Sequence, residues 1–123
     1  MPLSVLLVDD DVHFRRLAAV MLRDGDAIVA GEAADCATGL HAARTLRPQA
    51  AIVDVNLPDG SGTELAAGIA ELPNRPRVAL VSSDADAVTS AEALRLGAVG
   101  FWPKSELADG IAELLRDGDS EPR

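Results

Sequence analysis

Three consecutive aspartates, Asp9, Asp10 and Asp11, directly follow the first apolar run of the chain, Val5–Val8. Neighbouring carboxylates repel one another, so this arrangement calls for a nearby cation. Mg²⁺ is suitable, because it takes oxygen ligands and is commonly held by one or two carboxylates together with a phosphate group. No His or Cys stands at the ends of the expected strands, which disfavours zinc or copper. These residues therefore predict a magnesium site.

Further groups of complementary chemistry follow later apolar runs. The third run ends at Asp54, the fourth at Ser82, and the fifth leads to Lys104. A carboxylate, a hydroxyl and an ammonium group around a metal ion can orient and neutralise a transferring phosphoryl group. The acceptor would be a carboxylate, which would become an acyl phosphate. Lys104 is the only lysine among eleven Lys and Arg residues, which favours a role for a compact point charge.

The elements that must position these groups alternate along the chain. Short apolar runs without polar alternation are typical of strands buried on both faces of a parallel sheet. The expected strands are Ser4–Val8, Ala27–Ala30, Ala50–Val53, Val78–Val81 and Ala98–Phe101.

Between these runs, apolar residues recur with helical spacing and are expected to face the sheet. They are Phe14, Leu17, Ala18, Met21 and Leu22; Ala37, Leu40, Ala43 and Leu46; Leu65, Ile69 and Leu72; Ala87, Val88, Ala91 and Leu94; and Leu107, Ile111, Leu114 and Leu115. Five strand–helix units joined by right-handed crossovers give an α/β fold, a parallel sheet with helices on both faces. Ligands bind such sheets at the carboxyl ends of the strands, where Asp9, Asp54 and Lys104 are expected to meet.

Length and composition limit the class of protein. A chain of 123 residues fits one domain, and its scarcity of aromatic residues predicts an aliphatic core. The net charge of −9 argues against direct binding to nucleic acid or to an anionic membrane. A single cysteine, Cys36, fits a reducing compartment, and neither a signal peptide nor a membrane-spanning run is evident, so a cytoplasmic location is predicted.

Four segments in register, "VLLVDDD", "AIVDVNLPDGSG", "VALVSSD" and "LGAVGFWPKSEL", resemble the receiver domain of two-component response regulators, including the chemotaxis-regulator-like proteins. The resemblance implies a doubly wound (βα)5 fold with the flavodoxin-like strand order 2-1-3-4-5. It implies a receiver domain over residues 1–117, followed by a short polar tail, residues 118–123. With no effector domain after it, the chain is expected to be a stand-alone receiver.

The resemblance also implies roles for individual residues. Asp54 matches the phospho-accepting aspartate, and Ser82 and Lys104 match the residues that bind the phosphoryl oxygens. The implied ligands of Mg²⁺, for which Mn²⁺ could substitute, are Asp9, Asp10, Asp54 and the backbone carbonyl of Asn56. The implied switch residues are Ser82 and Phe101.

Two departures from the family pattern stand out. Phe101 has no hydroxyl group, so a switch here would rely on packing. Pro103 precedes Lys104, whereas the family often has a proline directly after the lysine, commonly with a cis peptide bond. A cis bond between Lys104 and Ser105 is not expected, because a non-proline cis bond costs about 2.5–4 kcal/mol.

The function implied is that of a signalling phospho-acceptor and not of a turnover enzyme. The phosphoryl group would come from a histidine kinase or phosphotransfer protein, and phosphorylation would alter a protein-binding surface. The downstream partner is undefined, and a phosphorylation-dependent homodimer is compatible with the resemblance.

Several alternatives stay open on the sequence. A haloacid-dehalogenase-type phosphatase would use Asp9 as nucleophile and Asp11 as general acid. A flavodoxin-like cofactor binder is disfavoured, because the three aspartates would repel a phosphate. A pseudo-receiver would bind its partner without phosphorylation. Asp11 is more readily interpreted as the cap of the first helix, Cys36 as a structural residue, and Trp102 either as core or as part of a partner surface.

Overall fold

The computed structural model describes residues 2–116 and contains a five-stranded parallel sheet. The strands are β1 (Leu3–Val8), β2 (Ala27–Ala33), β3 (Ala50–Asp54), β6 (Arg77–Ser82) and β7 (Gly100–Pro103). Their spatial order is β2-β1-β3-β6-β7. When only the five strands of this sheet are numbered along the chain, the order is 2-1-3-4-5, so the predicted fold class is confirmed.

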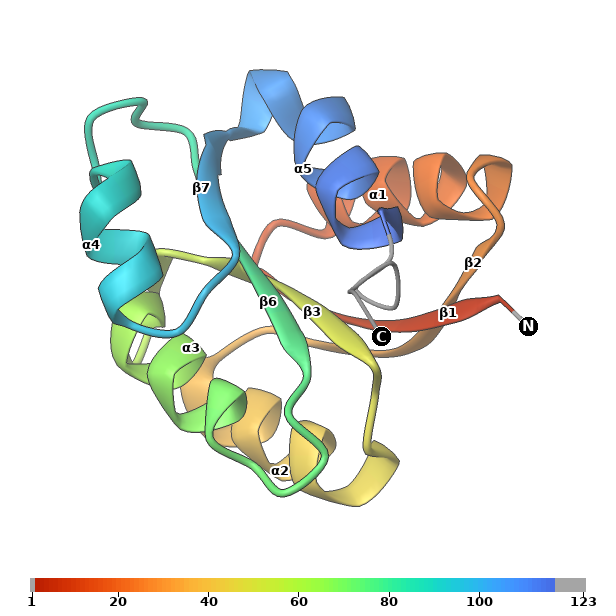
Figure 1. Cartoon of the computed structure of the whole chain (residues 1–123), viewed down its shortest axis with the longest axis horizontal. Helices are drawn as coiled ribbons and strands as arrows, with labels where there is room; N and C mark the ends of the chain where they lie inside the picture. The colour runs from red at the N-terminus through yellow and green to blue at the C-terminus, as the bar shows by residue number, and fades with distance from the viewer. Residues whose placement is uncertain (1, 117–123) are drawn as a thin grey trace, which may run out of the picture.

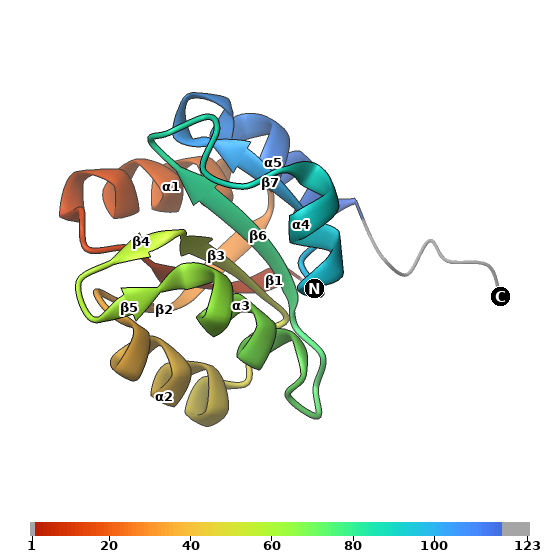
Figure 2. The ribbon, with the colours of Figure 1, turned by 90° about the vertical axis from the view of Figure 1, so that its left-hand side faces the viewer.

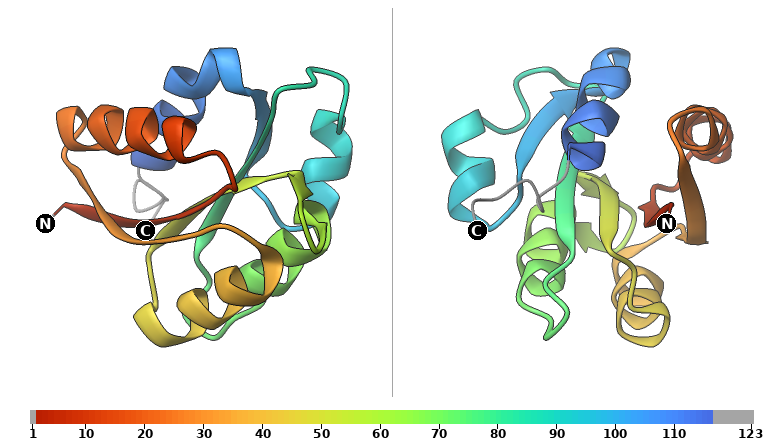
Figure 3. Two further views of the ribbon diagram at one scale, coloured as in Figure 1. Left: turned by 180° about the vertical axis from the view of Figure 1, so that it is seen from behind. Right: turned by 45° about the vertical axis from the view of Figure 1, so that its right-hand side comes forward.

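Helices cover both faces of the sheet (Figures 1 and 3). They are α1 (Val12–Asp24), α2 (Cys36–Leu46), α3 (Gly62–Ala70), α4 (Ser90–Arg95) and α5 (Leu107–Leu115), with a 3₁₀ turn, η1 (Lys104–Glu106), before α5. One apolar cluster lies between the sheet and α1 and α5, and a second lies between the sheet and α2, α3 and α4. No described helix is long and apolar enough to cross a membrane.

The continuous apolar runs of the three central strands, β1, β3 and β6, are explained by burial of both of their faces, whereas the edge strands β2 and β7 are only partly buried. In β1, Val5 and Leu7 pack toward α1 and α5, whereas Leu6 and Val8 pack toward the opposite layer. The core is aliphatic as predicted, and Phe14 is the one aromatic side chain buried in it among the described residues.

Two strands, β2 and β7, differ from the prediction by more than one residue at a boundary. β2 continues to Ala33, and its pairing with β1 contains a register shift between Val5 and Leu6. The last strand begins at Gly100 instead of Ala98. The amide of Ala98 still donates to the carbonyl of Ala93 at the end of α4, so Ala98 belongs to the helix end.

Three leucines expected to face the sheet are exposed instead. Leu17, Leu46 and Leu94 have exposed fractions of 54%, 46% and 61%. In α4, a capping box formed by Thr89 and Glu92 starts the helix at Ser90. That start directs Ala93 inward instead of Leu94.

A short antiparallel hairpin that the sequence did not predict follows β3. Its strands are β4 (Asn56–Leu57) and β5 (Gly60–Ser61). Figure 2 shows it beside the first turn of α2. The hairpin leads directly from the end of β3 to the start of α3, so it shapes the loop that follows Asp54.

Candidate functional site

The three aspartates after β1 occupy different environments. Asp9 is buried, with an exposed fraction of 1%. Asp10 is exposed. Asp11 is the N-cap of α1, because its side chain accepts hydrogen bonds from the amides of His13 and Phe14. The prediction that Asp11 caps the first helix is confirmed, and a carboxylate engaged in this way is poorly placed to act as a general acid.

Asp9 is held on several sides. Its Oδ1 accepts a hydrogen bond from the amide of Asp11 at 2.8 Å, and its own amide donates to the carbonyl of Ala33 at 3.0 Å. The guanidinium of Arg15 donates to the carbonyl of Asp9 and, at 2.7 Å, to Oε1 of Glu32. Arg15 was not identified from the sequence, because it lies in α1 and its partner Glu32 lies in β2, and no local sequence pattern connects the two residues.

Asp54 ends β3 in a buried position, with an exposed fraction of 6%. Its Oδ1 accepts a hydrogen bond from the amide of Asn56 at 3.1 Å. Burial raises the pKa of Asp54, and the negative charge of Asp9 adds to this effect. The Asn56 amide and the charge of Lys104 act in the opposite direction without cancelling the rise. The folded protein therefore makes ionisation of this carboxyl group costly unless further positive charge is nearby.

Lys104 supplies positive charge to both buried carboxylates. Its Nζ lies 2.7 Å from Oδ2 of Asp9 and 3.3 Å from Oδ2 of Asp54. The same atom lies 4.4 Å from the centre of the Phe14 ring, in position for a cation–π contact. Burial by itself would lower the pKa of Lys104, but the close contact with the Asp9 carboxylate and its negative charge, and then those of Asp54, raise it overall. The ammonium group therefore stays protonated between the two carboxylates.

The site fits a hard cation. Asp9, Asp10 and Asp54 can each offer a carboxylate oxygen such that all three oxygens lie within 4.8 Å of one another. Oδ2 of Asp9 is buried, and no described donor meets it with hydrogen-bond geometry, although Nζ of Lys104 is 2.7 Å away. An all-oxygen set containing a buried oxygen without a hydrogen bond suits Mg²⁺. Asn56 is exposed and lies two residues after Asp54, whose Oδ1 accepts a hydrogen bond from the Asn56 amide.

The remaining predicted residues lie on neighbouring strands. Ser82 is buried at the end of β6, and its Oγ accepts a hydrogen bond from the amide of Asp84 at 3.0 Å. It directly follows Val81, the residue that pairs with Asp54. Phe101 is half-buried on β7, next to Leu80, and packs toward the layer of α2 to α4.

The chain around Lys104 agrees with the sequence-based expectation. Pro103 ends β7 and Lys104 begins η1. The described residues contain no cis peptide bond, so the Lys104–Ser105 bond is trans. Trp102 is half-buried and packs toward the layer of α1 and α5, against Gly110, which supports its assignment to the core.

Cys36, at the start of α2, is not an activated thiol. Burial, together with a hydrogen bond to Asp59, raises its pKa to about 11. Its Sγ also lies 3.7 Å from the carbonyl oxygen of Ser61, to which it can donate. The structural interpretation of Cys36 is therefore favoured. Asp59, which contacts the same helix end, was not identified from the sequence.

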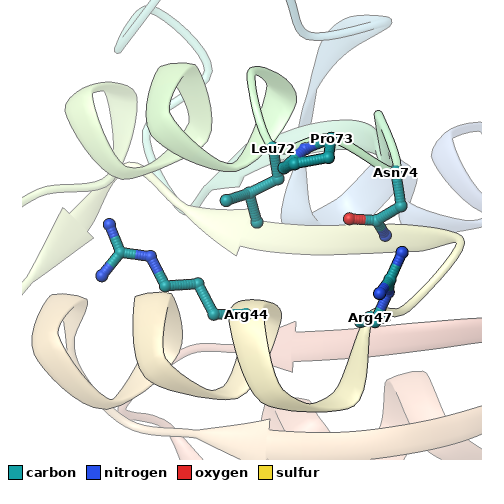
Figure 4. Close-up of a pocket in the computed structure, with 5 residues that line it drawn as sticks. All are labelled: Arg44, Arg47, Leu72, Pro73 and Asn74. Atoms are coloured by element: carbon teal, nitrogen blue, oxygen red, sulfur yellow. The ribbon is translucent and has the colours of Figure 1, made fainter.

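Two hollows lie outside the carboxylate cluster. A cavity of about 440 Å³ lies between the loop after β3 and α4, lined in part by Val55, Thr63 and Leu96. A smaller one, of about 150 Å³, is lined by Arg44, Arg47, Leu72, Pro73 and Asn74 (Figure 4). No predicted site residue lines the smaller hollow.

Comparisons with known proteins match almost the whole chain. The family model for the response regulator receiver domain matches residues 5–116. The acid tolerance regulatory protein ActR of Rhizobium meliloti is 34% identical over 113 residues, covering 91% of this chain and 57% of that protein. The photosynthetic apparatus regulatory protein RegA of Cereibacter sphaeroides is 32% identical over 121 residues, covering 97% of this chain and 65% of that protein.

Among solved structures, the response regulator domain of Thermotoga maritima CheB superposes with a TM-score of 0.82 at 26% identity, with 100% of both chains covered. The chain spans 57% of the length of ActR and 65% of the length of RegA.

Proposed function

The chain belongs to the response regulator receiver domain family, and from this premise we propose that it accepts a phosphoryl group on Asp54 in a magnesium-dependent reaction. The observation that carries the proposal is the position of the Asp54 carboxylate, which is buried, 3.3 Å from the ammonium group of Lys104 and clustered with Asp9 and Asp10. Phosphorylation adds negative charge to the acceptor residue, and the positive charge of Lys104 beside Asp54 would compensate that added charge.

The donor in this proposal is a phosphohistidine of a histidine kinase or phosphotransfer protein. A carboxylate oxygen of Asp54 attacks phosphorus, the P–N bond of the donor breaks, and its electron pair returns to the imidazole nitrogen. The donor ring carries a proton on its other nitrogen, so the products are an acyl phosphate on Asp54 and a neutral histidine on the donor. Lys104 pairs with one phosphoryl oxygen, and the hydroxyl of Ser82 donates a hydrogen bond to another.

Asp9, Asp10, Asp54 and the carbonyl of Asn56 are the proposed ligands of Mg²⁺, with Mn²⁺ as a substitute. When bound, the ion neutralises charge that develops on the transferring phosphoryl group. The chain itself contributes the carboxylate oxygens of Asp9 and Asp54, which are buried, and the ammonium group of Lys104 held beside them.

Phosphorylation is proposed to change a protein-binding surface. Ser82 and Lys104 would be drawn toward the new phosphoryl oxygens, and Phe101 would repack against the neighbouring layer, because it has no hydroxyl group to form a switch hydrogen bond. The proposed output is binding of another protein or a phosphorylation-dependent homodimer, and not direct binding of nucleic acid or membrane.

Location and chain organisation are part of the same proposal. The proposed compartment is the cytoplasm, where a donor kinase domain would act. Residues 1–117 are assigned to the receiver domain and 118–123 to a polar tail, but residues 117–123 lie outside the described part of the chain.

Mass spectrometry of the chain after treatment with acetyl phosphate and Mg²⁺ tests the assignment. We expect one added phosphoryl group that maps to Asp54 after borohydride reduction and is absent from Asp54→Asn and from samples in excess EDTA. Labelling of Asp9 would instead support the phosphatase alternative, and unlabelled wild-type protein would support a pseudo-receiver.

A further inference from the structure

The carboxylate of Asp59 joins the loop after β3 to the first turn of α2. Its Oδ1 accepts a hydrogen bond from the amide of Cys36 at 2.7 Å, and its Oδ2 accepts one from the amide of Ala37 at 3.0 Å. These two bonds, first that of Cys36 and then that of Ala37, hold the pKa of Asp59 below its ordinary value. Asp59 is therefore ionised at neutral pH and bound through both oxygens.

Two aspartates share the start of α2. The first amides of a helix have no partner within the helix and are satisfied by other groups. Asp35, the adjacent N-cap, accepts from the amide of Thr38 at 2.8 Å. The amides of Cys36 and Ala37 bond to Asp59, which is more than twenty residues away in the chain. Asp35 is thus a local cap, whereas Asp59 also attaches a separate loop to the helix.

That loop contains Asn56, whose backbone carbonyl is a proposed ligand of the metal ion. Asp59 stands in the turn of the hairpin in which Asn56 pairs with Ser61 and Leu57 pairs with Gly60. The amide of Asn56 already holds Oδ1 of Asp54 at 3.1 Å. The hairpin is also held by the buried side chain of Leu57, and Asp59 fixes its exposed tip.

We infer that Asp59 is a positioning residue of the metal site, which fixes the direction of the Asn56 carbonyl by attaching the hairpin to α2. A ligand oriented before the ion binds does not have to be ordered during binding, and groups that orient ligands strengthen metal affinity for this reason. The inference rests on the proposed function, because it assumes that Mg²⁺ binds at Asp9, Asp10 and Asp54.

Separate substitution of Asp59 and Asp35, the two aspartates that bind the first amides of α2, distinguishes a role in positioning the metal ligand from a role in helix stability. Mg²⁺ would be titrated into the ¹⁵N-labelled full chain, with the amide shifts of Asp54 and Asn56 as the readout. We expect Asp59→Ala to raise the Kd for Mg²⁺ about tenfold, the low end of the effect of losing a group that orients metal ligands. Asp35→Ala, the matched control, should lower the melting temperature but leave the Kd unchanged. Asp59→Asn keeps one acceptor oxygen and should give an intermediate Kd.

The amide of Cys36 provides a readout that does not depend on metal. In Asp59→Ala it should exchange with solvent faster than in the wild type, because its hydrogen bond is lost. An unchanged Kd in Asp59→Ala, or an equal rise in Asp35→Ala, would overturn the positioning role while leaving the proposed function intact. Wild-type protein without a Mg²⁺-dependent shift at Asp54 would instead refute both the metal site and the inference.

Discussion

Nζ of Lys104 lies 2.7 Å from Oδ2 of Asp9, closer than the 3.3 Å that separates it from Oδ2 of Asp54. Both carboxylates are buried, and among the described side chains Lys104 is the cation that forms ion pairs with them. Asp9 therefore takes part in holding the lysine as well as in the proposed metal site.

Lys104→Met should destabilise the fold at pH 7 by about 3–5 kcal/mol, because removal of one partner leaves buried charges uncompensated. Urea denaturation of both proteins measures the difference. The double variant Asp54→Asn/Lys104→Met is the control and should recover part of the loss, since one of the two stranded carboxylates is gone. Equal stability of Lys104→Met and wild type would show that the ion pairs do not support the fold.

Asp54→Asn should make the fold more stable at pH 7 by roughly 0.5–2 kcal/mol, the usual size of a single stabilising substitution. Burial raises the pKa of Asp54 above the ordinary value of 3.8, so the folded protein keeps its proton to higher pH than the unfolded chain. The wild type therefore loses stability as the pH rises through the folded-state pKa.

The stability difference between Asp54→Asn and wild type should accordingly disappear below the ordinary pKa. Denaturation curves recorded from acidic to neutral pH test this dependence. Asp86→Asn, a change at an exposed aspartate, is the control and should be as stable as the wild type at pH 7. A variant less stable than the wild type at pH 7 would contradict the sign of the effect.

The clustering of the candidate site residues was predictable because the carboxyl ends of parallel strands meet at one edge. That rule brings Asp9, Asp54 and Lys104 together from the strand positions alone, without knowledge of the loops. The rotation of each helix was less predictable, since Leu17 and Leu94 satisfy the apolar period and are nevertheless exposed. A period of 3.6 residues identifies a helix, but its caps and neighbours decide which of several apolar residues face the core.

The hairpin after β3 and the attachment of Asp59 to Cys36 could not be predicted in this way. The hairpin strands have only two residues each, too short for any alternation to be visible. The partners of Asp59 lie 22 and 23 residues earlier in the chain, and only the packing of α2 beside the loop brings them together. Local patterns contain no information on such contacts.

Gly62→Ala should disturb the loop after Asp54, because a Cβ at this position would lie 1.8 Å from the carbonyl oxygen of Asp54. We expect a loss of about 1–3 kcal/mol in the free energy of unfolding, the usual cost of overpacking, together with slower phosphorylation by acetyl phosphate. Gly68→Ala in the same helix is the control: nothing lies within 4 Å of its Cβ, and the substitution should be neutral or stabilising. Matching effects of the two substitutions would contradict the close approach.

The three aspartates after β1 should separate into two roles when each is substituted. Asp11→Ala removes the cap of α1 and should lower the melting temperature while leaving the Kd for Mg²⁺ unchanged. The amides of Phe14 and His13 hold the pKa of Asp11 below its ordinary value, so its stabilising effect is present at neutral pH and is lost as the pH falls through that lowered pKa.

Asp10→Asn should show the opposite behaviour, because Asp10 is exposed and proposed to bind the ion directly. Without Mg²⁺ its melting temperature should be at least that of the wild type, because one of the mutually repelling carboxylates is gone. With Mg²⁺ at about 100 times the wild-type Kd, the wild type should gain about 2.7 kcal/mol of stability, and Asp10→Asn should gain much less. Thermal denaturation with and without Mg²⁺ measures both quantities. A Mg²⁺ response lost in Asp11→Ala and retained in Asp10→Asn would reverse the assignment, since the helix cap would then be the metal ligand.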